Sequence, residues 1–441
     1  MIPNFTGDLI TPDHPSYESA RSIWNATVQK RPALIARCKG VVDIVACVKF
    51  AAQANLLTAI RGGGHNVGGR ALCDDGLVID LSLMRAIHVD PATRRVRVQC
   101  GATLGDLDRE THAFGLAVPV GVVAKTGVAG LTLGGGVGWL IRKHGMSIDN
   151  LLSCQLVTAS GEILNASASE NEDLFWALRG GGGNFGVVVS MEFQAHPVSL
   201  ILGGMVMYPR ADAMEVIKNY RDYICSAPDE LTAYALLIHS PDGAPLVAIA
   251  ACYCGDLAEG ERVLAPIRNF GKPIADLFQP MPFPVMQGLF AGAFPDGNQN
   301  YWKANMMATL PDAAIEVLVA QANASASPLS ALVIENYSGA ASRVSNHSTA
   351  YGHRELIWHV IIAAQCASPA EFPSIRDWAR AAYAALEPYS QKAHFLTVLD
   401  ADQESDVASA FGANLNRLEA IKKKYDPHNF FRVNQNIAPA P

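Results

Sequence analysis

The sequence has little positive charge and no long apolar segment. Its 441 residues include 34 Lys and Arg against 41 Asp and Glu, a formal net charge of -7 at pH 7. Nucleic acids and anionic membranes bind basic surfaces, so neither is an expected partner. No apolar run of membrane-spanning length occurs, and "MIPNFTGDLITPDHPSYESA" lacks the basic and apolar regions of a secretory signal. We therefore expect a cytoplasmic protein that acts on a small molecule.

Paired cysteines and metal-binding spacings are also missing. The nine cysteines are an odd, scattered set, and Cys252 and Cys254 have one residue between them rather than two. Such a set does not form a disulfide framework. The histidines show no H-x-x-x-H spacing on a helix, so no metal site is expected. Nothing in the sequence indicates an oligomeric state, and no G-x-x-x-x-G-K-[ST] segment of a P-loop nucleotidase occurs.

Glycine, by contrast, is abundant, and it gathers in three clusters of the first half. These are "IRGGGHNVGG" (60–69), "KTGVAGLTLGGGVGWL" (125–140) and "LRGGGGNFGVVVSMEF" (178–193). Consecutive glycines let backbone N–H groups converge on an anion without interference from Cβ atoms. A single cluster is as well explained by a tight turn, but three clusters beside predicted strands favour a long phosphate-bearing ligand.

The third cluster formally matches the dinucleotide fingerprint G-x-G-x-x-G. Gly181, Gly183 and Gly186 have the required spacing. The fingerprint needs a strand before it and a helix after it, whereas here the predicted helix comes first and the strand "VVVSMEF" follows. A Rossmann domain is therefore not expected.

The apolar pattern predicts an α+β fold in two parts. Near the N-terminus a helix at 41–56 is followed by a short strand that leads into the first glycine cluster. A further helix ends at Gly180, with Ser169 and Glu172 at the spacing of a capping box. From about residue 199, "LTAYALLIH" and "PLVAIAACYC" flank the turn "SPDGA" as a hairpin, and helical segments accompany them. This part is typical of an antiparallel sheet with helices on one face.

Four segments together resemble the FAD-linked oxidases of the vanillyl-alcohol-oxidase type, in the berberine-bridge-enzyme-like branch. They are "IRGGGHNVGG", "GVAGLTLGGGVGWL", "DLFWALRGGGGNFGVV" and "KYDPHNFFRVNQNI", in this order. The resemblance extends from "RPALIARC" to the C-terminal tail and is strongest to small bacterial members. It implies a PCMH-type FAD-binding domain of two α+β subdomains (1–198), a substrate domain (199–411) and a C-terminal segment (412–441) that returns to the FAD domain.

The resemblance also implies how FAD is held. His65 matches the histidine that is bonded covalently to the flavin, while Val123 stands where many relatives carry a second, cysteinyl bond, so a single bond is expected. Thr126 matches a position near the oxygen-reactive face and is small enough to admit O2. Arg61 either neutralises the phosphates or faces solvent. The expected FAD-binding set is completed by Gly62, Gly63, Gly64, Asn66, Gly69, Gly121, Gly127, Gly130, Gly134, Gly135, Gly136, Gly183, Val188, Asn434 and Asn436.

The usual tyrosine base of these relatives is missing. The matching segment, "HFLTVLDAD", carries Phe395, Thr397 and Val398 instead. Oxidation of this kind needs a group that takes or orients the proton of an O–H or N–H while hydride leaves the adjacent carbon. Another side chain must therefore serve.

His359 is the first candidate for the missing base. It matches a second catalytic position of the family, on a strand where it shares a face with Ile357 and Ile361. Free imidazole titrates near ~6.5, which suits a base at neutral pH. A hydrogen-bonded core histidine explains the same pattern equally well. Tyr337 and Tyr301 are further candidates, and either is also explained as a packed aromatic.

The function implied is oxidation of a C–OH or C–N centre in a small organic substrate by hydride transfer to flavin N5, with O2 as electron acceptor. Three alternatives remain: a flavin dehydrogenase with another acceptor, an oxidative cyclase of secondary metabolism, and a non-catalytic flavin-binding protein. The substrate cannot be read from the motifs, because side chains of the middle domain select it.

Overall fold

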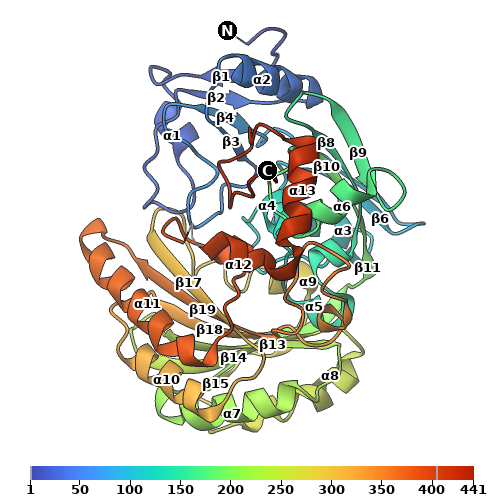
Figure 1. The fold of residues 1–441 in the computed structure, drawn as a ribbon. Helices are drawn as coiled ribbons and strands as arrows, with labels where there is room; N and C mark the ends of the chain where they lie inside the picture. The colour runs from blue at the N-terminus through green and yellow to red at the C-terminus, as the bar shows by residue number, and fades with distance from the viewer. Residues whose placement is uncertain (1, 404–405) are drawn as a thin grey trace.

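The computed structural model describes residues 2–403 and 406–441 and has the predicted α+β fold. Two smaller sheets and a two-stranded ribbon are built from the first 198 residues, and a larger sheet is built from residues 200–366. Figure 1 shows the smaller sheets in the upper part of the view and the large sheet below them. No helix in the described ranges is long and apolar enough to cross a membrane.

The first sheet has the strand order β1-β2-β4-β3, in which β2, β4 and β3 run parallel. Helix α2 connects β2 to β3 and buries Ile44, Cys47 and Val48, as its helical spacing of apolar residues predicts. Strand β3 ends at Arg61, so the first glycine cluster leaves the end of a strand. The elements are β1 (Asp8–Ile10), α1 (Tyr17–Arg21), β2 (Leu34–Arg37), α2 (Val41–Gln53), β3 (Thr58–Arg61) and β4 (Leu77–Asp80).

The second sheet is antiparallel, with the order β5-β6-β10-β8-β9. Its central strand, β10, follows the third glycine cluster and is buried along most of its length. The elements of this region are β5 (Ile87–Asp90), β6 (Arg95–Gln99), α3 (Leu104–His112), β7 (Leu116–Ala117), α4 (Val128–Leu133), α5 (Ile141–His144), β8 (Leu151–Val157), β9 (Ile163–Ser167), α6 (Glu172–Leu178), β10 (Val187–Gln194) and β11 (His196–Pro197).

The capping box expected at Ser169 is wrong. Helix α6 begins at Glu172, and its N-cap is Asn171, which has a φ of 49° and makes no side-chain cap bond. Ser167 pairs with Glu170 in an isolated bridge, so Ser169 belongs to the tight turn that follows β9. The turn places a residue in the left-handed region before the helix, and asparagine tolerates that conformation better than most residues.

The large sheet has the order β15-β12-β14-β13-β18-β19-β17, and β16 also pairs with β12. The predicted hairpin is confirmed, because Leu231 pairs with Tyr253 and His239 pairs with Pro245 around the turn. The strands are β12 (Leu200–Pro209), β13 (Leu231–His239), β14 (Pro245–Tyr253), β15 (Ala275–Asp276), β16 (Gln279–Pro282), β17 (Gln299–Met307), β18 (Ala331–Asn336) and β19 (Trp358–Cys366).

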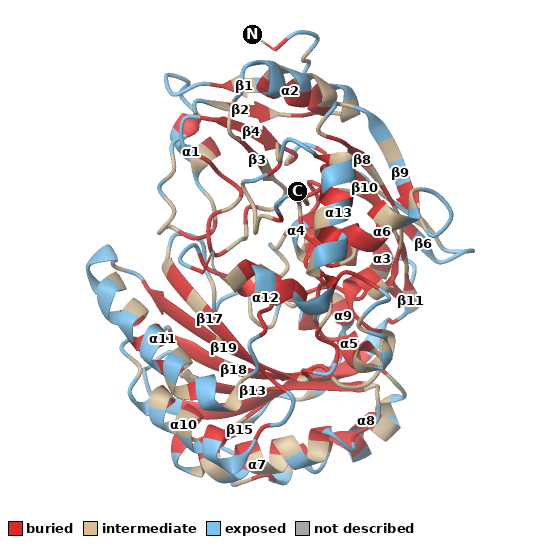
Figure 2. Ribbon diagram, in the orientation of Figure 1, coloured by how far each residue is buried: buried red, intermediate tan, exposed pale blue. Residues whose placement is uncertain are grey.

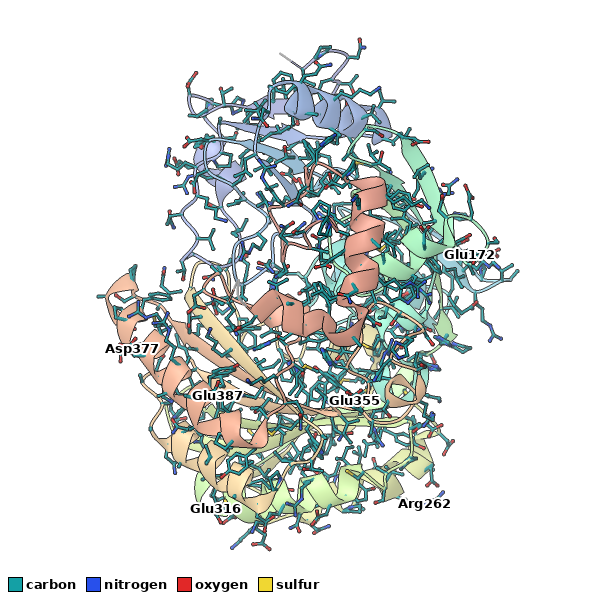
Figure 3. The ribbon with its side chains drawn as sticks, viewed as in Figure 1. Glu172, Arg262, Glu316, Glu355, Asp377 and Glu387 are labelled. Atoms are coloured by element: carbon teal, nitrogen blue, oxygen red, sulfur yellow. The ribbon has the colours of Figure 1, made fainter. Side chains whose placement is uncertain are left out.

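Helices cover the outer face of this sheet, as the sequence predicted. Figure 2 shows the buried strands of this sheet above a layer of helices whose outward sides are largely exposed. Glu316 on α10 and Asp377 on α11 lie on that outer side, where Figure 3 labels them. The helices that follow β12 along the chain are α7 (Ala213–Ile224), α8 (Leu257–Leu264), α9 (Phe283–Met286), α10 (Asp312–Asn323), α11 (Phe372–Leu386) and α12 (Val407–Phe411).

The last segment of the chain packs on the first part of the molecule. Helix α13 (Leu415–Tyr425) ends before Pro427, as expected, and its buried Lys422 donates to the carbonyl oxygen of Asn184 at 2.8 Å. In the tail that follows, Asn434 Nδ2 donates to the carbonyl oxygen of Gly183 at 3.0 Å. These contacts, together with the separate large sheet, support the domain division that we propose at residues 198 and 411.

Candidate active site

A cavity of about 330 Å³ lies where the glycine clusters face the large sheet. All three clusters contribute to its lining, together with the tail that carries Asn434. On the other side, the lining residues are Trp302 from β17, Glu335 from β18, Tyr337 just after β18, and His359 and Ile361 from β19. One continuous space therefore joins the glycine clusters to the inner face of the large sheet.

Two of the glycine clusters meet backbone to backbone. A Cβ atom on Gly63 would lie only 2.5 Å from Gly127 Cα, and a Cβ on Gly127 would meet Gly63 just as closely. The cavity wall at this point can form only if both residues are glycine. Gly130 and Gly183, by contrast, have no atom within 4 Å of a Cβ position, because they border open space.

His65 lies at the tip of the first cluster with one ring nitrogen unpaired. Its Nε2 is buried and has no hydrogen-bond partner among the described residues. The ring stacks on Trp24, with 4.4 Å between centroids and 13° between planes. Burial lowers the pKa of His65 to about 4, so the imidazole is neutral at physiological pH. A neutral, fixed imidazole with a free nitrogen is suited to bonding or donating to a ligand in the cavity.

Most of the expected FAD-binding residues line this cavity. In addition to His65, they are Gly62, Gly63, Gly64, Asn66, Gly121, Thr126, Gly127, Gly130, Gly134, Gly183, Val188 and Asn434. Val123 also lines it, whereas Cys100 and Cys154 do not, and all nine cysteines are free.

Five expected residues lie outside the lining of this cavity, and their contact with FAD stays a prediction. The Arg61 guanidinium donates to the carbonyl oxygens of Ala20 and Ser22, and Arg61 lines a second hollow together with Gly63 and His65. The other four have neighbours that account for their position or lie just beyond the lining. Gly69 faces Val28, Gly135 faces Met146, Gly136 faces Ser147, and Asn436 follows the lining residues Asn434 and Gln435.

At the large sheet, three polar side chains form one hydrogen-bonded cluster. Tyr337 donates its hydroxyl proton to Glu335 Oε2, and its oxygen lies 2.8 Å from His359 Nδ1. His359 Nδ1 is also 3.0 Å from the same carboxylate oxygen. Burial and the neighbouring Glu335 raise the pKa of Tyr337 well above its ordinary value, so Tyr337 remains a phenol. We refer to Glu335, Tyr337 and His359 as the polar cluster.

The polar cluster is deeply buried at the end of the cavity. His359 is 0 % exposed, while Glu335 and Tyr337 each retain 5 % of their surface. The face predicted for His359 is confirmed for Ile361, which also lines the cavity, whereas Trp358 and Val360 pack with the helices. Ile357, which precedes β19, packs with that same core, so its predicted place beside His359 is wrong. The surface that this cluster offers to the cavity therefore belongs mainly to Tyr337 and Glu335, with His359 behind them.

Several lining residues carry buried polar atoms that lack a partner among the described residues. They are His65 Nε2, Trp302 Nε1, His359 Nε2, Asn434 Oδ1 and Gln435 Nε2. Buried polar groups in native proteins are nearly always hydrogen-bonded, so such a set around one space indicates a polar ligand. The glycine positions that open onto the cavity leave room for it. Both observations fit FAD, whose ring system and phosphates carry many acceptors and donors.

Sequence reasoning missed Glu335 and Trp302. The strand "ALVIEN" contained a signal for Glu335, because a single acid among apolar residues at a buried strand position is unusual. Tyr301 lies on the opposite face of β17, where its hydroxyl contacts Asp402 at 2.7 Å and Arg380 at 2.9 Å. Tyr301 is therefore a packed aromatic outside the cavity. Within the described residues, no cluster of three or more His, Cys, Asp or Glu could hold a metal ion.

Comparison with known families identifies the class. Residues 32–167 match the FAD binding domain, and residues 395–438 match the segment described as berberine and berberine like. An FAD-linked oxidoreductase of Dictyostelium discoideum is 34% identical over 94% of this chain and 91% of its own length. The chain belongs to this family of FAD-linked oxidoreductases and is an FAD-dependent oxidoreductase, as the resemblance of its motifs implied.

Individual relatives share the fold along nearly the whole chain. The (R)-6-hydroxynicotine oxidase of Paenarthrobacter nicotinovorans is 32% identical over 98% of this chain and 97% of its own. The crystal structure of 6-hydroxy-D-nicotine oxidase from Arthrobacter nicotinovorans has a TM-score of 0.91 at 31% identity, covering 99% of this chain and 98% of that one. A chitooligosaccharide oxidase is 23% identical and superposes with a TM-score of 0.87, covering 99% of this chain and 98% of that one. At this level of identity the similarity shows the fold alone. The PCMH-type architecture is thereby confirmed.

Proposed function

We propose that this protein is an oxidase in which FAD is attached through His65 and receives hydride from a carbon that bears a hydroxyl or amine. The observation that carries the proposal is the single cavity that runs from the glycine clusters and His65 to the polar cluster. Small-molecule oxidation by the 6-hydroxynicotine oxidases, at 31–32% identity, supports the reaction class. When bound, FAD supplies the acceptor for the hydride.

The attachment through His65 rests on its position and on its unpaired nitrogen. The ring is held by its stacking on Trp24, and Nε2 has no partner in the described protein. Among the described residues no cysteine lines the cavity, and Val123 occupies the position of the second bond in relatives. The protein therefore holds FAD through one bond, and that bond is to histidine.

Proton removal falls to the polar cluster. Tyr337 lies at the cavity surface and stays protonated, so it cannot act as a phenolate. Its oxygen can accept the substrate proton only while its own proton passes to Glu335 Oε2 or to His359 Nδ1, both of which it contacts. Glu335 and His359, which lie behind Tyr337, thus hold the proton. The apolar wall formed by Ile361 and Phe395 excludes water from the reacting atoms.

In this proposal O2 is the acceptor of the electrons that the substrate gives up. Thr126 lines the cavity as a small side chain beside Gly127, where a bulky residue would close the approach to the flavin. The cytoplasmic location expected from the sequence stays a prediction.

Acid precipitation of the purified protein tests the attachment. Flavin should remain in the precipitate of the wild type and appear in the supernatant of His65→Ala, which still binds FAD through the glycine clusters. A peptide map should place the flavin on the peptide that contains His65. Release of all flavin from the wild type, or a map with flavin on a cysteine, contradicts the proposed bond. Anaerobic bleaching of the flavin by an alcohol or amine, followed by rapid recovery in air, tests the reaction.

A further inference from the structure

Where the inner face of the large sheet borders the cavity, its titratable side chains stand in one row. Glu335 on β18 is paired with Tyr234 on β13 and with His359 on β19, and His359 is paired with Met306 on β17. Side chains in such a row project from the same face of the sheet, and rows of one face repeat every second residue. The titratable groups that the large sheet offers to the cavity are thus concentrated at this row, where Glu335 and His359 stand side by side.

The next row on the same face is entirely apolar. Leu236, Val333, Ile361 and Ala304 are paired in this order across the same four strands. One row further, Ala331 and Trp302 are both paired with Ala363. Of these rows, Ile361 and Trp302 reach the cavity, and the indole N–H of Trp302 is the one polar group that the two side chains bring.

The other walls near the polar cluster are apolar as well. Phe395 and Val398 line the cavity, and the Phe395 ring is 5.3 Å from that of His359 and 6.3 Å from that of Tyr337. Leu131 and Val137 complete this region from the side of the FAD-binding domain. Beside the polar cluster, only Thr397 of the 395–398 segment offers a hydroxyl.

Building on the proposed function, we propose that the substrate is a largely apolar, ring-containing alcohol or amine with one O–H or N–H at the oxidised carbon, and that saccharides are excluded. The single polar cluster can pair with one such group. A sugar would bring several further hydroxyls against Ile361, Phe395 and Val398, and each one left unpaired in an apolar site lowers affinity by roughly tenfold. An aromatic or alicyclic ring gains from the same walls, because its burial removes apolar surface from water.

Anaerobic titration of the flavin-loaded protein tests the substrate class through binding. The probes are benzyl alcohol, benzylamine, benzyl methyl ether, glucose and cellobiose, and the readout is the shift of the flavin absorbance spectrum. Benzyl alcohol or benzylamine should bind at least tenfold more tightly than either sugar. The ether, which has no donor for the polar cluster, should bind roughly three- to tenfold more weakly than the alcohol. Sugar binding as tight as that of the ring compounds, or no binding of any ring compound, overturns the proposal.

A matched pair of variants locates the effect on the inner face. Ile361→Thr should weaken binding of the ring compounds roughly fourfold or more, because it removes apolar contact from the cavity wall. The same change at Ile163, which is exposed on β9, should leave binding unchanged. If Ile361→Thr and Ile163→Thr bound the ring compounds equally tightly, the proposed role of the apolar wall in binding would be wrong. Ring compounds that bind without bleaching the flavin would leave the substrate class standing and refute the oxidase proposal, so the two failures are distinguishable.

Discussion

At the scale of single residues, the reaction depends on how three buried side chains share protons. Tyr337 touches both Glu335 and His359, and no other route for its proton is visible among the described residues that line the cavity. Glu335 and His359 are therefore the groups that must take the Tyr337 proton whenever Tyr337 accepts one from the substrate.

Removing the hydroxyl of Tyr337 should have the largest effect on flavin reduction. Tyr337→Phe should slow anaerobic reduction by roughly 10²–10⁴-fold, the usual contribution of a positioned acid or base. Tyr351→Phe is the matched control, because Tyr351 is buried in the same apolar cluster but does not line the cavity. Stopped-flow absorbance measures both rates, and a Tyr337→Phe rate within a few fold of the control would refute the relay.

His359 and Glu335 should act through Tyr337, which predicts a different signature. His359→Gln and Glu335→Gln should each slow reduction by roughly ten- to a hundredfold, since a hydrogen bond to a charged or basic partner is lost. They should also change the pH profile of the reduction rate, because the remaining partner must hold the proton alone. If the pH profile of flavin reduction keeps its wild-type shape in both variants, Glu335 and His359 have a structural role only.

Oxygen access depends on the size of residue 126. Thr126→Leu places a larger side chain in the cavity wall beside Gly127, so reoxidation of the reduced flavin should slow by about an order of magnitude. Flavin reduction should change much less, since Thr126 is not part of the polar cluster. Mixing pre-reduced enzyme with O2 in a stopped-flow instrument separates the two steps. If reoxidation proceeds at the wild-type rate, Thr126 does not govern oxygen access.

At the scale of elements, the contact between the first two glycine clusters shapes the FAD site. Gly63→Ala adds a Cβ against the Gly127 backbone, which cannot yield as a flexible side chain would. We expect a loss of about 1–3 kcal/mol in the free energy of unfolding and a lower flavin content. Gly292→Ala is the control, because no atom lies within 4 Å of its Cβ position. Thermal unfolding and the flavin-to-protein absorbance ratio report the result, and equal values for both variants would show that the clusters tolerate the added atom.

Elements with a clear period or turn were predictable from the sequence. Helix α2 shows the 3.6-residue spacing of a helix buried on one side, and the "SPDGA" turn fixes the β13–β14 hairpin. The start of α6 was not predictable, because Ser169 and Glu172 match a capping box while the chain places Asn171 in a left-handed conformation. Local patterns identify elements, but a competing turn decides where one begins.

The site residues that stand in a contiguous motif were predictable from the sequence. The residues that only tertiary pairing brings together were not. His65 and the glycines around it stand in contiguous motifs. Glu335 and His359 are brought together by strand register, since β18 and β19 pair them across 24 positions of sequence. A one-residue shift in that register would send Glu335 to the helix-covered face. For Arg61 the motif left phosphate and solvent open as partners, and it could not show that the fold also brings the backbone carbonyls of Ala20 and Ser22 to the guanidinium.

At the scale of the whole molecule, one buried acid joins the two parts on either side of the cavity. Asp108 on α3 accepts a hydrogen bond from Gln287, which follows α9, at 3.0 Å, and Gln287 also donates to the carbonyl oxygen of Gly121 at 2.9 Å. The second carboxylate oxygen of Asp108 and the amide oxygen of Gln287 have no partner among the described residues. Burial raises the pKa of Asp108 to about 7, and a protonated carboxyl supplies a donor that these two oxygens lack.

This acid makes the stability of the folded protein depend on pH in a direction opposite to that of most surface carboxylates. Between about pH 4 and pH 7 the folded state keeps the Asp108 proton while the unfolded state releases it, so the free energy of unfolding falls as the pH rises through this window. A shift of the pKa from 3.8 to about 7 corresponds to roughly 4 kcal/mol.

Asp108→Asn keeps the shape, stays neutral and can donate, so its stability should exceed that of the wild type above pH 7 and approach it near pH 4. Urea unfolding at a series of pH values measures the difference, with Glu110→Gln, a half-buried acid on the same helix, as control. Parallel curves for Asp108→Asn and the wild type would show that Asp108 is ionised in the folded protein and that the link between the two parts does not depend on its proton.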